Sequence, residues 1–67
     1  MALQVNDSIE VNINAVWKPA VVRDLYTEKG TDFLLADFPQ FPFIHFMQIM
    51  LINEHTVWRY PDAHFSP

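Results

Sequence analysis

Histidine and serine side chains are the first candidates for chemistry in this 67-residue chain. His45, His55 and His64 are ten and nine residues apart, which matches no metal-ligand spacing. Ser8 and Ser66 have no arranged base that could activate a nucleophile. We therefore expect surface or hydrogen-bonding roles for these five residues.

The carboxylates and the glycine content also point away from catalysis. Asp24, Asp32 and Asp37 are expected at solvated strand ends, whereas an acid–base pair needs a shared pocket. Gly30 is the only glycine, and one glycine cannot build a phosphate-binding loop. We expect no enzymatic activity, no cofactor and no metal ion.

The charge of the chain restricts the class of partner. The formal net charge is −4. The basic residues are scattered along the sequence: Lys18, Arg23, Lys29 and Arg59. They form no stripe that could follow a phosphate backbone, so nucleic-acid binding is disfavoured. A net negative field attracts cations, which favours a cationic partner such as a basic peptide segment.

Membrane insertion and secretion are not expected. The apolar-rich stretch 41–52 is broken by Pro42, His45 and Gln48, and is too short to span a bilayer. The N-terminus lacks the basic start and apolar run of a signal peptide. We expect a cytoplasmic protein. The start at Met1 and the short length suggest a complete small protein of phage, plasmid or bacterial origin.

Length and composition predict one marginally stable folded domain over residues 1–67, with loose ends at 1–5 and 62–67. The apolar content of 51% is too high for a disordered chain. There is no cysteine, so no disulfide can reinforce the core. A partner subunit is one remaining source of stability for a chain of this size.

The residue pattern indicates β-strands throughout. Alternation predicts a first strand at 8–13, and further strands are expected at 19–26 and 32–38, from Phe43 onward and at 56–60. Gly30 is expected to supply the left-handed residue of a hairpin turn at 27–30. The competing interpretation of 44–52 is a helix. The predicted core includes Ile9, Val11, Ile13, Val21, Leu35 and Val57.

Five short strands with a tight hairpin predict an all-β fold: a five-stranded small barrel, with room for a short 3-10 or helical turn near 47–55. Closing the sheet would remove the exposed edges that promote aggregation.

Three segments resemble Tudor and Agenet domains. Residues 5–11 (VNDSIEV) are similar to their opening step, with Asn6 in place of the usual glycine. Residues 17–22 (WKPAVV) and 33–38 (FLLADF) are similar to their aromatic-x-x-Ala-x-Val segment and third strand. The chain departs from the family at Pro39, where a Gly-Asn step is usual.

This resemblance implies a five-stranded SH3/Tudor-like small barrel with a partner-binding surface. In the Tudor family an aromatic cage holds methylated lysine or arginine through cation–π attraction. Trp17 and Phe38 match cage positions, and Asp37 matches the acidic position. Phe41 and Phe43 lie nearby in the sequence, as does Tyr26. The alternative for Trp17 and Phe38 is packing at the ends of the barrel.

A second resemblance belongs to a different class. Residues 15–22 (AVWKPAVV) and 47–50 (MQIM) are similar in order and distance to segments of the type II dihydrofolate reductases, which are small oligomeric barrels. That resemblance implies an NADPH-dependent oxidoreductase with Gln48 and Ile49 in its pore. Met50 stands where that family has its defining tyrosine.

The segment 43–52 is apolar at eight of ten positions. A strand with one face in water should alternate, so a partner is expected to cover the second face. The residues assigned to this oligomer or partner interface are Ile44, Phe46, Met47 and Met50, and a two-fold dimer is the default. The alternative is that Leu3, Val5 and Phe65 wrap the segment within one chain.

Overall fold

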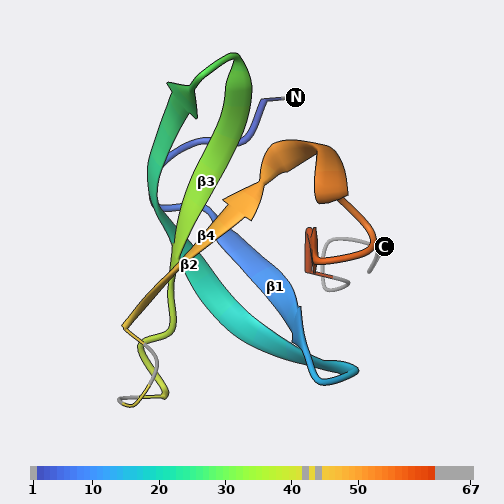
Figure 1. Cartoon of the computed structure of the whole chain (residues 1–67). Helices are drawn as coiled ribbons and strands as arrows, with labels where there is room; N and C mark the ends of the chain where they lie inside the picture. Colours follow the sequence, from blue (N-terminus) through green and yellow to red (C-terminus); the bar gives the residue numbers. More distant parts are fainter. Residues whose placement is uncertain (1, 42, 44, 62–67) are drawn as a thin grey trace.

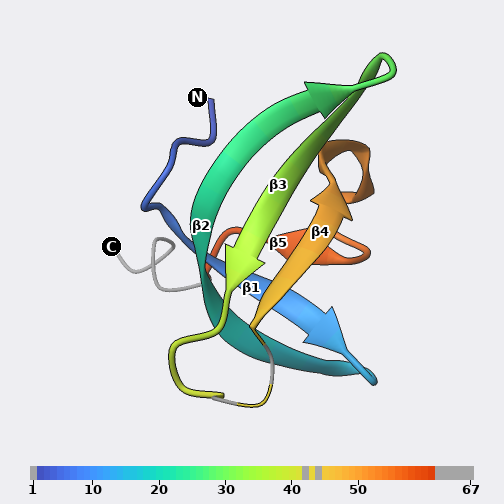
Figure 2. The same cartoon turned by 60° about the vertical axis from the view of Figure 1, so that its left-hand side comes forward.

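The computed structural model describes residues 2–41, 43 and 45–61. Its strands are β1 (Ser8–Ile13), β2 (Val16–Glu28), β3 (Thr31–Asp37), β4 (Phe46–Met50) and β5 (Trp58–Arg59). A 3-10 helix, η1 (Leu51–Asn53), follows β4. The strands form one antiparallel sheet in the order β4-β3-β2-β1-β5 (Figures 1 and 2). The all-β expectation is confirmed, and η1 confirms the turn expected near 47–55. No ladder between β4 and β5 closes the sheet within the described part.

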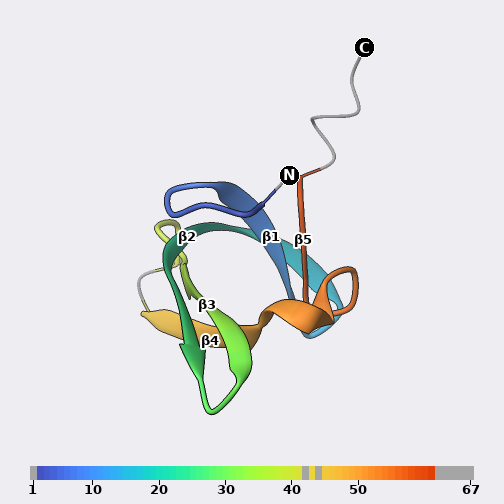
Figure 3. The same cartoon turned by 90° about the horizontal axis from the view of Figure 1, so that it is seen from above.

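The long strand β2 bends and joins two halves of the sheet. Residues 16–21 of β2 pair with β1, and residues 21–28 pair with β3. A bulge between Val22 and Asp24 inserts Arg23 as an unpaired residue. The extra residue changes which positions face the interior, from Val22 before the bulge to Leu25 after it. The strands can therefore curve around a common interior (Figure 3).

The core draws on all five strands. Its buried side chains come from β1, β2, the β3 region, β4 and β5: Ile9, Val11, Ala20, Val22, Leu34, Ala36, Phe38, Ile49 and Trp58. The predicted burial of Ile9 and Val11 is confirmed. Ile13 and Val57 are only partly buried and pack against this cluster.

Two residues that were predicted in the core lie on the outer face of the sheet instead. Val21 and Leu35 are half-buried on the outer face, whereas their neighbours Val22 and Leu34 are fully buried. A shift of one residue moves a side chain to the opposite face of a strand. Both sites are apolar doublets, so alternation could not indicate which member points inward.

Several predicted strand limits also differ from the structure. β2 begins at Val16, so Pro19 lies inside the strand rather than at its start. Pro19 is tolerated because residues 16–20 pair only with β1, which leaves one edge of this segment without a ladder. β4 begins at Phe46 rather than Phe43, and β5 is reduced to two residues. The helix considered over 44–52 is not formed at 46–50, which is strand.

Two hairpins use left-handed turns. Gly30 has φ +80° and Lys29 has φ +51°, which confirms the turn expected there. The β1–β2 hairpin has the same geometry without glycine, at Asn14 (φ +54°) and Ala15 (φ +68°). A two-residue loop with both φ values positive matches the twist of the flanking strands. Asn6, which precedes β1, is also left-handed at φ +78°.

The two turns predict opposite effects of exchanging alanine and glycine. Ala15→Gly should raise the free energy of unfolding by about 1 kcal/mol, because it relieves a left-handed alanine. Gly30→Ala should lower it by about 1 kcal/mol; no atom lies within 4 Å of the added Cβ, so the cost is conformational. Urea denaturation of both variants measures these changes. If both substitutions changed the free energy of unfolding in the same direction, the result would contradict the two turn conformations.

Candidate functional site

An apolar patch covers the outer face of β2, β3 and β4. Cross-strand pairing brings Phe33 beside Met50 and Leu35 beside Gln48. The ring of Tyr26 stacks on that of Phe33, with centroids 5.6 Å apart, and the Gln48 amide donates a 2.7 Å hydrogen bond to the Tyr26 hydroxyl. We define the outer patch as the apolar side chains of this face: Tyr26, Phe33, Leu35, Phe46 and Met50.

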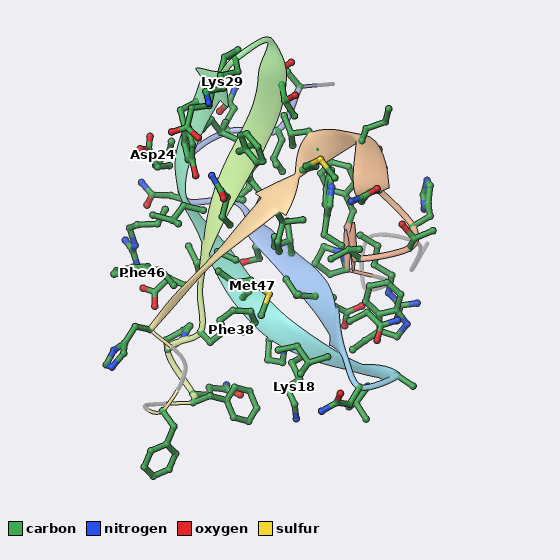
Figure 4. All side chains as sticks on the ribbon, in the orientation of Figure 1. Lys18, Asp24, Lys29, Phe38, Phe46 and Met47 are labelled. Atoms are coloured by element: carbon green, nitrogen blue, oxygen red, sulfur yellow. The ribbon has the colours of Figure 1, made fainter. Side chains whose placement is uncertain are left out.

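The predicted interface residues divide between the two faces of β4. Phe46 and Met50 lie on the outer patch and are 58% and 40% exposed. Met47 faces inward and packs against the core, as Figure 4 shows beside the outward Phe46. The structure therefore places Met47 on the face opposite the outer patch, apart from Phe46 and Met50. Ile44 lies outside the described residues.

The predicted cage of Trp17 and Phe38 is not formed. Phe38 is 1% exposed and belongs to the core. Trp17 pairs with Asn12 on the opposite, outer face, where the Arg59 guanidinium carbon lies 4.0 Å from the Trp17 ring centroid. Arg59 also donates a 2.8 Å hydrogen bond to Glu10. The Trp17 ring therefore already holds a cation from its own chain.

The other predicted partner-binding residues do not gather at one place. Asp37 forms an ion pair with Arg23 on the outer face. Phe41 is half-buried, with the Lys18 ammonium 4.5 Å from its ring centroid. Phe43 is 94% exposed. Phe41 and Phe43 therefore provide aromatic surface.

A groove that the sequence did not reveal lies between the β2–β3 hairpin, η1 and β5. Its volume is about 450 Å³. Its apolar wall includes residues distant in sequence: Leu3, Leu25, Leu51, Trp58 and Tyr60. The Trp58 indole donates a 3.1 Å hydrogen bond to the Leu51 carbonyl, and its ring meets Tyr60 edge-on with centroids 5.3 Å apart. These contacts hold Trp58 in place within the apolar wall of the groove.

The charge of the groove is negative. Asp32 and Glu54 are its charged lining residues, and no lysine or arginine of the described chain lines it. The Thr27 hydroxyl donates to the Asp32 carboxylate and orients it. Burial raises the pKa of Tyr60 above its ordinary value of 10.0, and Glu54 and Asp7 raise it further. A negative potential opposes a phenolate and attracts a cation.

Comparisons with protein-family models, with curated proteins and with solved structures find no significant match to this chain. The arrangement of its residues is therefore the basis for a functional proposal. Gln48 is exposed on the outer face, whereas Ile49 is 3% exposed in the core. The two residues that resemble a reductase pore consequently face opposite sides of β4.

The residues described by the structure include no group of three or more histidines and carboxylates placed to hold one metal ion. His64 lies outside these residues. No helix in the described ranges is long and apolar enough to cross a membrane.

Proposed function

We propose that the chain is a non-catalytic protein-interaction module that binds a basic peptide segment in the groove beside η1. The observation that carries the proposal is the combination of an apolar wall with two carboxylates and, among the described residues, no basic lining residue. A lysine or arginine side chain has matching chemistry, because its aliphatic stem can lie on apolar surface while its charged end stays near water.

Each wall of the groove has a role in this proposal. Leu25 and Leu51 would contact the aliphatic stem of the bound side chain, and Tyr60 offers a ring for cation–π attraction. Asp32 and Glu54 would attract the charged end. Asp32 is exposed and the Glu54 side chain is 38% exposed, so salt should screen this attraction.

We further propose that the sheet is a barrel of the SH3/Tudor-like type. The strand β2 supports this fold because it is shared by two halves of the sheet. A long bent strand of this kind allows five strands to surround one core. The groove then lies at one end of the barrel.

A titration with short peptides tests the proposed ligand class. A lysine- or arginine-rich peptide should bind with micromolar affinity and perturb the tyrosine and tryptophan fluorescence, and added salt should weaken binding. An acidic peptide of equal length should not bind. Trimethylation of the lysines should change the affinity little, because the Trp17–Phe38 cage is not formed.

A control variant distinguishes binding in the groove from general attraction of the peptide to the net charge of the protein. Glu54→Gln should weaken basic-peptide binding several-fold, whereas Glu28→Gln should not. Both changes remove one negative charge, but Glu28 does not line the groove. An equal loss in both variants, or equal binding of acidic and basic peptides, would contradict the proposal.

A further inference from the structure

The two edges of the sheet differ in how they are protected from pairing. β5 is a two-residue strand that carries the charged Arg59. β4 has five residues, FMQIM, without a charge, a proline or a bulge. Its pairing partner among the described strands is β3 alone. Natural sheets usually protect an edge with charge, proline or a bulge, so β4 lacks the ordinary defences against strand addition.

The surface beside this edge is also apolar. Phe46 and Met50 are exposed on β4, and the outer patch continues onto Phe33 of β3. The nearest charged pair on this face is Asp37 with Arg23, which neutralise each other. Asp24 also lies on this face, but on β2 opposite Leu35, so β3 separates its carboxylate from the β4 edge. Two copies of the chain, each with a net charge of −4, could therefore pair their β4 edges without placing carboxylates directly opposite each other.

The geometry points to a second copy of this chain as the occupant of the β4 edge. The two β4 strands would pair antiparallel across a two-fold axis and join two five-stranded sheets into one. This contact uses the same surface in both copies, which closes the assembly as a dimer. Tyr26 and Phe33 of the outer patch also line the groove, but no residue of β4 does, so the strand pairing itself does not require the basic ligand.

The register of this pairing follows from the alternation of side chains. Residues directly opposite each other in an antiparallel pair lie on the same face. The outer faces of both copies lie on the same side of the joined sheet only if one residue pairs with its own copy in the second chain. The two-fold axis then passes midway between these two equivalent residues. Gln48 is the middle residue of β4. Centring the axis there pairs all five residues and places Phe46 opposite Met50 of the second copy.

The same register places the two Gln48 side chains opposite each other at the axis. Their amides can donate to and accept from one another, while Phe46 and Met50 form apolar pairs on either side. The shared contact is only five residues long, so the expected dimer is weak and forms at micromolar concentration.

A charge-exchange experiment at Gln48 tests this register. Gln48→Lys and Gln48→Glu should each weaken self-association by at least about tenfold, because they place like charges opposite each other. An equimolar mixture of the two variants should recover a dimer. Sedimentation velocity over micromolar concentrations measures the association. Each variant also loses the hydrogen bond to Tyr26, so thermal melts must show that both remain folded.

Val16→Lys is the matched control. Val16 is 53% exposed, close to the exposure of Phe46, but lies at the start of β2. This variant should dimerise like the wild type. A wild type that is monomeric at high micromolar concentration would overturn the proposal. So would dimers that tolerate Gln48→Lys alone, a mixture that fails to associate, or assemblies larger than a dimer.

Discussion

Leu34→Ala should unfold a large fraction of this protein, whereas Leu35→Ala should leave it folded. Leu34 is completely buried at the centre of the core, and truncating such a leucine costs about 2 to 5 kcal/mol. Leu35 is half-buried on the outer face, where the cost should be about 1 kcal/mol. Domains of this length rarely have more than about 3 to 5 kcal/mol of stability. Urea denaturation, with thermal melts, measures both variants.

This comparison tests the register of β3 directly. The two leucines are adjacent and chemically identical, so only their direction separates the expected results. A larger loss for Leu35→Ala would mean that β3 is displaced by one residue relative to its partners. Val22→Ala and Val21→Ala provide a second comparison on β2, because Val22 is buried and Val21 is half-buried. In both comparisons, the variant at the buried position should lose more stability than the variant at the half-buried position.

Sequence patterns identified the strands better than the direction of their side chains. The segment 8–13 alternates cleanly, and its predicted bounds and inward residues match β1. At Val21 and Leu35 two apolar residues are adjacent, so the pattern allowed either face. The bulge at Arg23 depends on pairing with β3, a long-range contact that local alternation does not contain.

The sequence predicted a hairpin turn only where it contains glycine. Gly30 indicated the β2–β3 hairpin. The β1–β2 hairpin places Ala15 in a conformation that alanine rarely adopts, so composition did not reveal it. Strand pairing on both sides of that turn imposes the conformation, since Ile13 pairs with Val16.

The candidate site was harder to predict because it is assembled from distant parts of the chain. Residues close together in sequence, such as Asp37 and Phe38, point to opposite faces of the sheet. The groove instead joins Leu3, Leu25 and Tyr60, which come together only through the fold. The acidic net charge suggested the same class of ligand that is proposed here, but it could not indicate where the carboxylates gather.

Reversing both groove charges should give the largest change in ligand preference. In the double variant Asp32→Lys/Glu54→Lys, the affinity for a basic peptide should fall about 100-fold, with about tenfold from each position. The groove would then attract acidic peptides of the same length. Fluorescence titration with both peptides measures the exchange. Both residues are accessible at the rim of the groove, so the core residues Leu34 and Trp58 should keep the domain folded.

The pKa of Tyr60 gives a second measurement that does not depend on a peptide. Glu54 contributes to raising this pKa, so replacing it by lysine should lower the pKa towards 10.0. Spectrophotometric titration of the phenol in the folded protein would show the change, and Tyr60→Phe identifies its signal. An arginine-rich peptide bound to the wild type should lower the pKa in the same direction, because its guanidinium groups stay charged where the phenol titrates and favour the phenolate. If the peptide binds but leaves the titration of Tyr60 unchanged, its binding site is elsewhere than the groove.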